Sequence, residues 1–280
     1  MIIGVHASIA RGYAYALAEV RALGCRALQI LPYPRRHSPS EEELSAFRAE
    51  RSLLGLQALL IHSRFVPSLA SSDGERRERS VRHLCRELRL AEGLGGDAFV
   101  LHAGAYSPGS REAEGVRLFA DSVRRAVRES DWKGPLLLEN VPGGGRRMGG
   151  TFEELARLQD ALGPEVRELG VCLDTAHAWA AGYDLSSAEG ALKFLARAHR
   201  LLGGDSVRAF HINDTRAPLS SHLENHAHLG KGRLGLEGLK ALLDRSEFAD
   251  TPGILETPKE GLEADRENLA VARRLSSASN

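Results

Sequence analysis

The sequence alternates between short apolar runs and longer amphipathic stretches along almost its whole length. The short runs are rich in Val, Ile, Leu and Ala, as buried strands are, whereas apolar residues in the longer stretches recur every three or four positions, as on one helix face. The predicted strands are Ile2–His6, Ala27–Leu31, Leu56–His62, Ala98–His102, Pro135–Glu139, Leu169–Asp174, Val207–His211 and Gly253–Glu256. The predicted helices are Ala10–Leu23, Glu41–Leu54, Arg76–Leu94, Arg111–Glu129, Thr151–Leu162, Ser186–Leu202, Leu236–Leu243 and Glu263–Leu275.

Strict alternation of strand and helix predicts an α/β fold whose strands are parallel and whose crossovers are right-handed. Eight such units in 280 residues, 42% of them hydrophobic, fit a closed (β/α)8 barrel better than an open sheet. No break in composition and no linker divides the chain, so a single domain over residues 1–280 is expected, with only Ser276–Asn280 as a frayed tail.

Nearly every predicted strand ends on a histidine or a carboxylate. These strand-end residues are His6, His62, His102, Glu139, Asp174, His211 and Glu256. The carboxyl ends of barrel strands surround one axis at one end of the barrel, so residues far apart in the sequence converge there. The sequence therefore predicts an active site at the C-terminal strand ends.

Histidine and carboxylate side chains without cysteine are a ligand set that suits zinc, manganese or iron. A single histidine at a strand end is also explained by a structural hydrogen bond, but a crowd of buried carboxylates repels itself unless cations lie among them. A carboxylate can also bridge two ions about 3.5–4 Å apart, as in enzymes of phosphoryl chemistry. The strand ends therefore indicate a site for more than one ion.

Two further segments carry ligand-type residues. In VCLDTAHAWAAGYDL, Asp174 is followed three residues later by His177, which fits either a metal site or an aspartate N-cap with the histidine in the first helical turn. In SHLENHAHLG, an extended loop would place Glu224 and His226 on the same side, where they could hold another ion with His177. The alternative for His222, Glu224, His226 and His228 is a solvated polar loop.

Composition bears on the binding partners of the protein and on its cellular compartment. Lys and Arg equal Asp and Glu at 37 each, so the total charge does not indicate a nucleic-acid partner, although a local basic face remains compatible with it. Cys25, Cys85 and Cys172 are widely spaced and odd in number, which argues against a disulfide framework and for a reducing cytoplasm. The sequence shows no signal peptide and no apolar span of about 20 residues, so a cytoplasmic protein without a membrane partner is expected.

The segments VCLDTAHAWAAGYDL, LLLENVPGGG, FHINDTRAPLSSHLENHAHLGKG and ILETP resemble the endonuclease IV family of apurinic/apyrimidinic endonucleases. The resemblance implies a TIM barrel with three zinc ions (Mn²⁺ being an alternative at one site) that cuts DNA 5′ of an abasic site and leaves a 3′-hydroxyl. Carried over by position, His62, His102 and Glu139 would hold the first ion, and Glu139, Asp174, His211 and Glu256 the second. His177, Glu224 and His226 would hold the third, with Glu139 and Glu256 acting in catalysis.

The same resemblance implies double-stranded DNA with abasic sites as the partner of a monomeric enzyme. Arg35, Phe65 and Lys231 are the expected DNA contacts, and Arg36, Arg64, Arg146 and Arg147 are further cations near the rim. The chain departs from the family pattern in four places: Glu224 stands for Asp, Asn225 for Arg, Phe65 for Tyr, and Lys231 for the Glu of LGEG. A lysine favours a phosphate partner, whereas the longer Glu224 changes the expected geometry of the third ion.

Two other function classes share the predicted fold. A sugar isomerase or epimerase also carries a metal set at the rim of such a barrel, so the fold does not separate it from a nuclease. Such enzymes commonly need one or two divalent ions, fewer than this ligand set can hold. A non-catalytic metal-binding barrel is the third alternative. Metal content distinguishes the nuclease from the isomerase, since three zinc ions per chain indicate the nuclease and one manganese or magnesium ion indicates the isomerase.

Overall fold

The strands of the described residues close into a parallel barrel, as predicted. The structure is a computed structural model that describes residues 1–35, 37–64 and 66–276. Around the barrel the strands follow the order β1-β10-β7-β6-β5-β4-β3-β2, and every pair of neighbours is parallel. The barrel strands are β1 (Ile2–His6), β2 (Ala27–Ile30), β3 (Ala58–His62), β4 (Ala98–His102), β5 (Leu136–Glu139), β6 (Leu169–Asp174), β7 (Val207–His211) and β10 (Pro252–Leu255).

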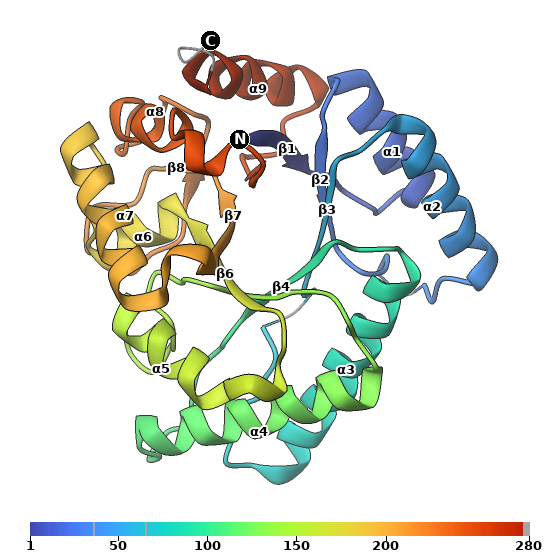
Figure 1. Cartoon of the computed structure of the whole chain (residues 1–280), viewed down its shortest axis with the longest axis vertical. Coiled ribbons are helices and arrows are strands. Elements are labelled where there is room, and N and C mark those ends of the chain that lie inside the picture. The colour runs from blue at the N-terminus through green and yellow to red at the C-terminus, as the bar shows by residue number, and fades with distance from the viewer. Residues whose placement is uncertain (36, 65, 277–280) are drawn as a thin grey trace.

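The helices form a ring outside the strands (Figure 1). They are α1 (Tyr13–Leu23), α2 (Glu41–Leu54), α3 (Gly74–Gly93), α4 (Glu112–Ser130), α5 (Phe152–Leu162), α6 (Thr175–Ala181), α7 (Ala188–Leu202), α8 (Glu237–Leu243) and α9 (Leu262–Ser276). Thr151 caps α5 with a capping box, in which its side chain accepts from the Glu154 amide. The (β/α)8 barrel expected from the alternating pattern is therefore confirmed.

The differences from the sequence-based elements have local causes. Helix α1 begins three residues later than predicted because Gly12 adopts a φ of 93°, outside the helical region. Helix α6 is the helix that the aspartate-cap alternative places after Asp174, whereas the small antiparallel pair β8 (Asp214–Thr215) and β9 (His226–Ala227) was not predicted. Both of these strands are shorter than the periodic stretches on which the sequence-based assignment depends. Ser276 belongs to α9 rather than to a frayed tail.

Strand alternation separates two apolar layers. One residue set, from Val5 and Leu28 to Leu255, packs between the strands and the surrounding helices. The other set forms a separate small cluster of residues from every barrel strand, which fills the barrel interior: Ile2, Ala27, Ala58, Leu60, Ala98, Val100, Leu137, Cys172, Ala209 and Ile254. Since side chains on one face recur every second residue, the residue two positions after the last interior apolar one also points inward. This register directs the polar strand ends to the barrel axis.

The structure bears on two expectations from composition, which concern membrane-spanning segments and the three cysteines. None of the described helices is long and apolar enough to cross a membrane. Cys25, Cys85 and Cys172 are buried, and each is a free cysteine. Burial raises the pKa of the Cys25 thiol to about 11 and that of the Cys172 thiol to about 12.

Gly4 lies where a side chain would meet the backbone of the neighbouring barrel strand. It lies opposite Ala27 in the β1–β2 register, and a Cβ built on it would come within 1.9 Å of the Ala27 carbonyl oxygen. Backbone atoms cannot move aside as a flexible side chain does. The closure of the barrel between β1 and β2 therefore requires glycine at this position.

We expect Gly4→Ala to lower the free energy of unfolding by about 1–3 kcal/mol, the usual cost of overpacking a closed core. Gly74→Ala is the matched control, because a Cβ at Gly74 meets no atom within 4 Å. Denaturant unfolding of both variants measures the difference. Equal stability of Gly4→Ala and the parent would contradict the close packing of β1 on β2.

Candidate metal centre

The strand-end residues converge at one end of the barrel into three overlapping groups of ligand-type atoms. Within each group the ligand atoms all lie within 4.8 Å of one another. The groups are His62, His102 and Glu139; Glu139, Asp174, His211 and Glu256; and Asp174, His177 and His226. The first two are the ligand sets predicted for two ions. The third differs from its prediction in one member, since it contains Asp174 in place of Glu224.

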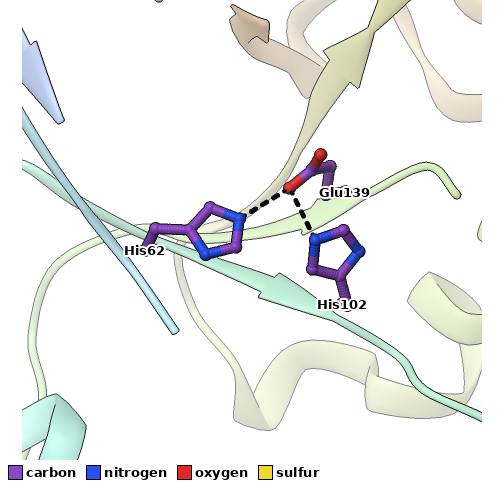
Figure 2. Close-up of side chains that lie close together, drawn as sticks. All are labelled: His62, His102 and Glu139. Atoms are coloured by element: carbon purple, nitrogen blue, oxygen red, sulfur yellow. Dashed lines mark hydrogen bonds and ion pairs between the residues drawn. The ribbon is translucent and has the colours of Figure 1, made fainter. Parts of the chain in front are cut away.

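The first group is built around one carboxylate oxygen. His62 Nε2 lies 2.9 Å and His102 Nε2 3.2 Å from Glu139 Oε2, so both imidazoles point at the same atom (Figure 2). Burial lowers the pKa of His102 to about 4, which leaves its imidazole neutral near pH 7. Burial opposes protonation of His62 as well, but the hydrogen bond and charge of Glu139 outweigh it and raise the pKa of His62. A neutral imidazole is the form that binds a metal ion.

The second group uses the other oxygen of the same carboxylate. His211 Nδ1 lies 3.0 Å from Glu139 Oε1, 3.2 Å from Glu256 Oε2 and 3.8 Å from Asp174 Oδ2. Glu139 is 1% exposed and Asp174 is fully buried. Glu139 therefore faces the first group with Oε2 and the second with Oε1, which is the arrangement of a bridging carboxylate.

The third group contains two imidazole nitrogens that have no hydrogen-bond partner among the described residues. They are Nε2 of His177 and Nε2 of His226, and both atoms are buried. Buried polar atoms normally have a hydrogen-bond partner, and an ion supplies the interaction that these two atoms lack. His226 Nε2 lies 3.9 Å from Asp174 Oδ2, and His177 Nε2 lies 3.6 Å from Glu224 Oε2. The residues therefore fit a metal ion here.

Glu224 lies at the edge of this third group. Its side chain is 61% exposed and it is not among the atoms within 4.8 Å of one another. The nearby His177 imidazole, 3.6 Å from Glu224 Oε2, lowers the pKa of Glu224 despite its partial burial. An exposed carboxylate one methylene longer than aspartate can turn away from or toward the His177 ring. Asp174 holds the inner position instead, so the structure gives it contacts with two groups.

Asp174 also satisfies the alternative prediction of a helix cap. Its Oδ1 accepts a hydrogen bond from the His177 amide at 2.7 Å, so it is the N-cap of α6. The cap and the metal-ligand prediction are compatible because Oδ2 remains directed at His211 and His226. His177 is placed in the first turn of α6 by this cap.

The histidines and carboxylates of this centre shift each other's pKa values toward the charged forms. Burial opposes protonation of His177, yet the nearby carboxylates of Asp174, Glu139 and Glu224 raise its pKa well above the usual value. The charges of His102 and His211 likewise hold the pKa of Glu139 well below its usual range in spite of burial. Buried carboxylates of this number are stable only beside positive charge, which protons on histidines or bound cations supply.

Several polar residues that form hydrogen bonds with these ligand groups were not identified by the sequence analysis. Asn213 donates from Nδ2 to Asp174 Oδ2 at 2.6 Å and accepts the Glu256 amide at Oδ1. Asn140 binds both the amide and the carbonyl of Asp174. Gln29 lies between His211 and Glu256. Asn140 and Asn213 directly follow or nearly follow strand ends, and this position could have identified them.

Asp214 holds the loop that carries His226. Its buried carboxylate accepts hydrogen bonds from the amides of Thr215, Gly230, Gly232 and Leu234. These contacts join both sides of the loop after β7. His222 and His228, which alternate with His226 in the sequence, point elsewhere: His222 Nδ1 lies 2.7 Å from the Pro142 carbonyl oxygen, and His228 contacts Asn268 and Glu260.

Two of the predicted DNA contacts, Arg35 and Lys231, lie in loops at the rim. Arg35 is exposed and lines a pocket of about 470 Å³ beside His6 and Glu256, and Lys231 is exposed in the turn after β9. A second pocket of about 520 Å³ lies over His62 and His102 and is also lined by Arg147. Phe65, the other predicted contact, and Arg36 lie outside the described residues.

Comparison with known proteins shows the family to which the chain belongs. Residues 17–275 match the family model described as xylose isomerase-like TIM barrel. The chain is 37% identical over 278 residues to the probable endonuclease 4 of Chloroflexus aurantiacus, and the alignment covers 97% of each chain. The chain belongs to the endonuclease IV family. The family prediction made from VCLDTAHAWAAGYDL and the other segments is therefore confirmed.

Solved structures separate the family from the fold. The crystal structure of endonuclease IV from Thermus thermophilus matches with a TM-score of 0.83 at 37% identity and covers 98% of each chain. A D-tagatose 3-epimerase-like protein matches with a TM-score of 0.78 but only 18% identity, covering 100% of this chain and 98% of the other. At that identity the epimerase shares the barrel alone, which is the ambiguity that the sequence leaves between nuclease and isomerase.

Glu87 supports the loop that follows His62 from outside the barrel. This α3 carboxylate is 3% exposed, and it accepts from Ser63 Oγ at 2.8 Å and from the Arg64 amide at 3.3 Å. Burial raises the pKa of Glu87 to about 7, with the hydrogen bonds from Ser63 and Arg64 opposing. The folded protein therefore holds a proton on Glu87 that the unfolded chain has already released.

We expect Glu87 to make stability fall with rising pH. A raised carboxyl pKa gives a contribution that is present below about pH 4.5 and is lost as the pH rises to about 7, a loss of about 3 kcal/mol. Unfolding of the parent and of Glu87→Gln across this range measures it, since the amide does not titrate. Glu92→Gln, on the exposed face of α3, is the control. A constant difference between parent and Glu87→Gln would contradict the raised pKa.

We expect Glu139→Gln to lower the number of bound divalent ions by at least one per chain while the barrel remains folded. A neutral amide offers one good acceptor where two groups share a carboxylate. Metal analysis with circular dichroism measures both quantities, and Glu168→Gln, at an exposed ion pair with Arg208, is the control. Unchanged metal content in Glu139→Gln would show that the carboxylate is not a shared ligand.

Proposed function

We propose that this protein is a zinc-dependent apurinic/apyrimidinic endonuclease that hydrolyses the phosphodiester 5′ of an abasic site in double-stranded DNA and leaves a 3′-hydroxyl. The observation that carries the proposal is Glu139, whose two oxygens serve two adjoining ligand groups while Asp174 joins the second to the third. Membership of the endonuclease IV family supports the same activity. We infer that residues 1–280 act as one domain and as a monomer.

Three zinc ions per chain are the proposed cofactors, with Mn²⁺ as an alternative at one site. His62, His102 and Glu139 would hold one ion, and Glu139, Asp174, His211 and Glu256 a second. His177 and His226 would hold the third, with Asp174 beside them and Glu224 turning inward. When bound, the ions supply positive charge that stabilises the phosphoryl transition state and lowers the pKa of water.

The chain's own residues then provide position and charge. Glu139 and Glu256 keep the ligand groups at fixed separation because both are anchored, Glu256 through Asn213 and Gln29. Arg147 lines the pocket above His62 and His102, where it would attract the phosphate to be cut. Arg35 and Lys231 at the rim would bind the flanking strand, and Phe65 would stack on a base.

The third ligand group favours the nuclease over a sugar isomerase or epimerase. Isomerisation by proton or hydride shift commonly needs one or two divalent ions, and the first two groups already provide for those. The buried, unpartnered Nε2 atoms of His177 and His226 have no role in such a two-ion site. Charge spread over a phosphoryl transition state gives a third cation a use.

Cleavage of a duplex with one abasic analogue tests the proposal. We expect a single incision 5′ of the lesion that leaves a 3′-hydroxyl, that stops with a chelator and returns with zinc. An intact duplex is the control for the lesion, and a panel of ketoses and aldoses is the control for isomerase activity. Metal-dependent turnover of a sugar without incision of the abasic duplex would overturn the proposal.

We expect Arg35→Ala to weaken binding of the abasic duplex by about 1–3 kcal/mol, the range for a side chain that stacks on a base. Binding of the parent should also weaken steeply with salt, because phosphate contacts release counterions. Fluorescence anisotropy at two salt concentrations measures both effects, and Arg82→Ala, exposed on α3, is the control. Equal affinity of Arg35→Ala and the parent would remove Arg35 from the DNA-binding surface.

A further inference from the structure

We propose that Gln29 is a positioning residue that fixes the tautomer of His211 and thereby directs the Nδ1 lone pair of His211 at the metal site. This inference rests on the proposed function only in requiring that an ion bind between His211 and the carboxylates. Gln29 lies on β2, on the inward face two residues after Ala27 of the barrel interior, and it is fully buried. No ligand role is open to it, since its amide is already engaged on both sides.

The amide of Gln29 connects two members of the second ligand group. Its Nε2 lies 2.7 Å from Glu256 Oε1 and 2.9 Å from His6 Nδ1. Its Oε1 lies 2.9 Å from Nε2 of His211, on the side of that ring opposite the carboxylates. One side chain from β2 therefore contacts both β7 and the residue after β10 inside the barrel.

The orientation of this amide follows from Glu256. An ionised carboxylate only accepts hydrogen bonds, so the Gln29 atom that faces Glu256 must be the NH₂ group. His6 Nδ1 lies 2.9 Å from the same Gln29 nitrogen and 3.0 Å from Glu256 Oε1. The opposite orientation would bring two acceptor oxygens together in a buried site, which is costly. The carbonyl oxygen of Gln29 consequently faces His211.

This orientation in turn decides where His211 carries its proton. A carbonyl oxygen can only accept, so His211 Nε2 must carry hydrogen and donate it to Gln29. In a neutral imidazole Nδ1 is then left with its lone pair. Nδ1 is the nitrogen that lies 3.0 Å from Glu139 Oε1 and 3.2 Å from Glu256 Oε2. Glu256 thus orients His211, which belongs to the same ligand group, through the amide of Gln29.

Among residues 1–35, 37–64 and 66–276, the hydrogen-bond contact at His211 Nε2 is with Gln29 Oε1, and the buried Cys172 thiol also interacts with the His211 side chain. A thiol can donate or accept, so it does not decide which ring nitrogen carries the proton, whereas a carbonyl oxygen only accepts. Methionine at position 29 would fill a similar volume but would neither donate to Glu256 nor accept from His211. Partners of this kind that orient ligands typically change metal affinity by about 10- to 100-fold when removed.

The first measurement reads the tautomer of His211 in the parent protein and uses a variant only to assign the signals. Long-range ¹H–¹⁵N NMR of the zinc-loaded protein, with His211 assigned through His211→Asn, reports which ring nitrogen carries the proton. We expect the proton on Nε2 and the metal on Nδ1. A proton on Nδ1, or zinc on Nε2, would overturn the proposal.

The second measurement compares Gln29→Met with Gln57→Met, which makes the same change at an exposed glutamine before β3. Zinc dissociation constants come from competition with a chromophoric chelator, without DNA. We expect Gln29→Met to raise the zinc dissociation constant of the ion held by His211 about 10- to 100-fold. The NMR spectrum of this variant should show both tautomers of His211. Gln57→Met should match the parent in both measurements. A Gln29→Met protein that folds and keeps both the parent affinity and a single tautomer would overturn the positioning role but leave the endonuclease proposal intact. A parent that binds no zinc would overturn both.

Discussion

The structure of the barrel end depends on one buried carboxylate shared between two sets of ligands. Glu139 faces His62 and His102 with one oxygen and His211 with the other, and it is almost inaccessible to solvent. Removing such a charge from water is unfavourable unless positive charge lies beside it. The surrounding histidines provide that charge when protonated, and they release their protons when a cation takes the same place. The pairing thus links the stability of this end of the barrel to the ions that it can bind.

The fold presents these groups through the simple period of a strand. Interior positions of the barrel are apolar in the lower layers, and the residue two positions on is the histidine or carboxylate, as in Leu60 and His62 or Cys172 and Asp174. Amide side chains then fix the ligands: Asn213 joins Asp174 to Glu256, and Gln29 joins Glu256 to His211. The result is a set of ligands whose positions are determined by hydrogen bonds even before an ion binds.

The sequence predicted the fold well because the fold depends on patterns of single strands, and each barrel strand was located within two residues. The strand-end residues His62, His102, Glu139, Asp174, His211 and Glu256, expected from the same patterns, lie together in the structure. Gln29 was missed because it lies inside an apolar run, ALQIL, where periodicity gives no sign of its partners. The role of Asp174 in the third group, in place of Glu224, depends on how the loop after β7 folds back. Asp214 determines that path through four amides, a tertiary contact that no local pattern contains.

Anomalous diffraction at the zinc absorption edge, from crystals grown with zinc, tests the shared-carboxylate centre most directly. Three peaks per chain are expected: one among His62, His102 and Glu139, one among Glu139, Asp174, His211 and Glu256, and one beside His177 and His226. Glu139 should contact the first two ions, one through each oxygen. A single peak, or two peaks with Glu139 bound to neither, would contradict the account.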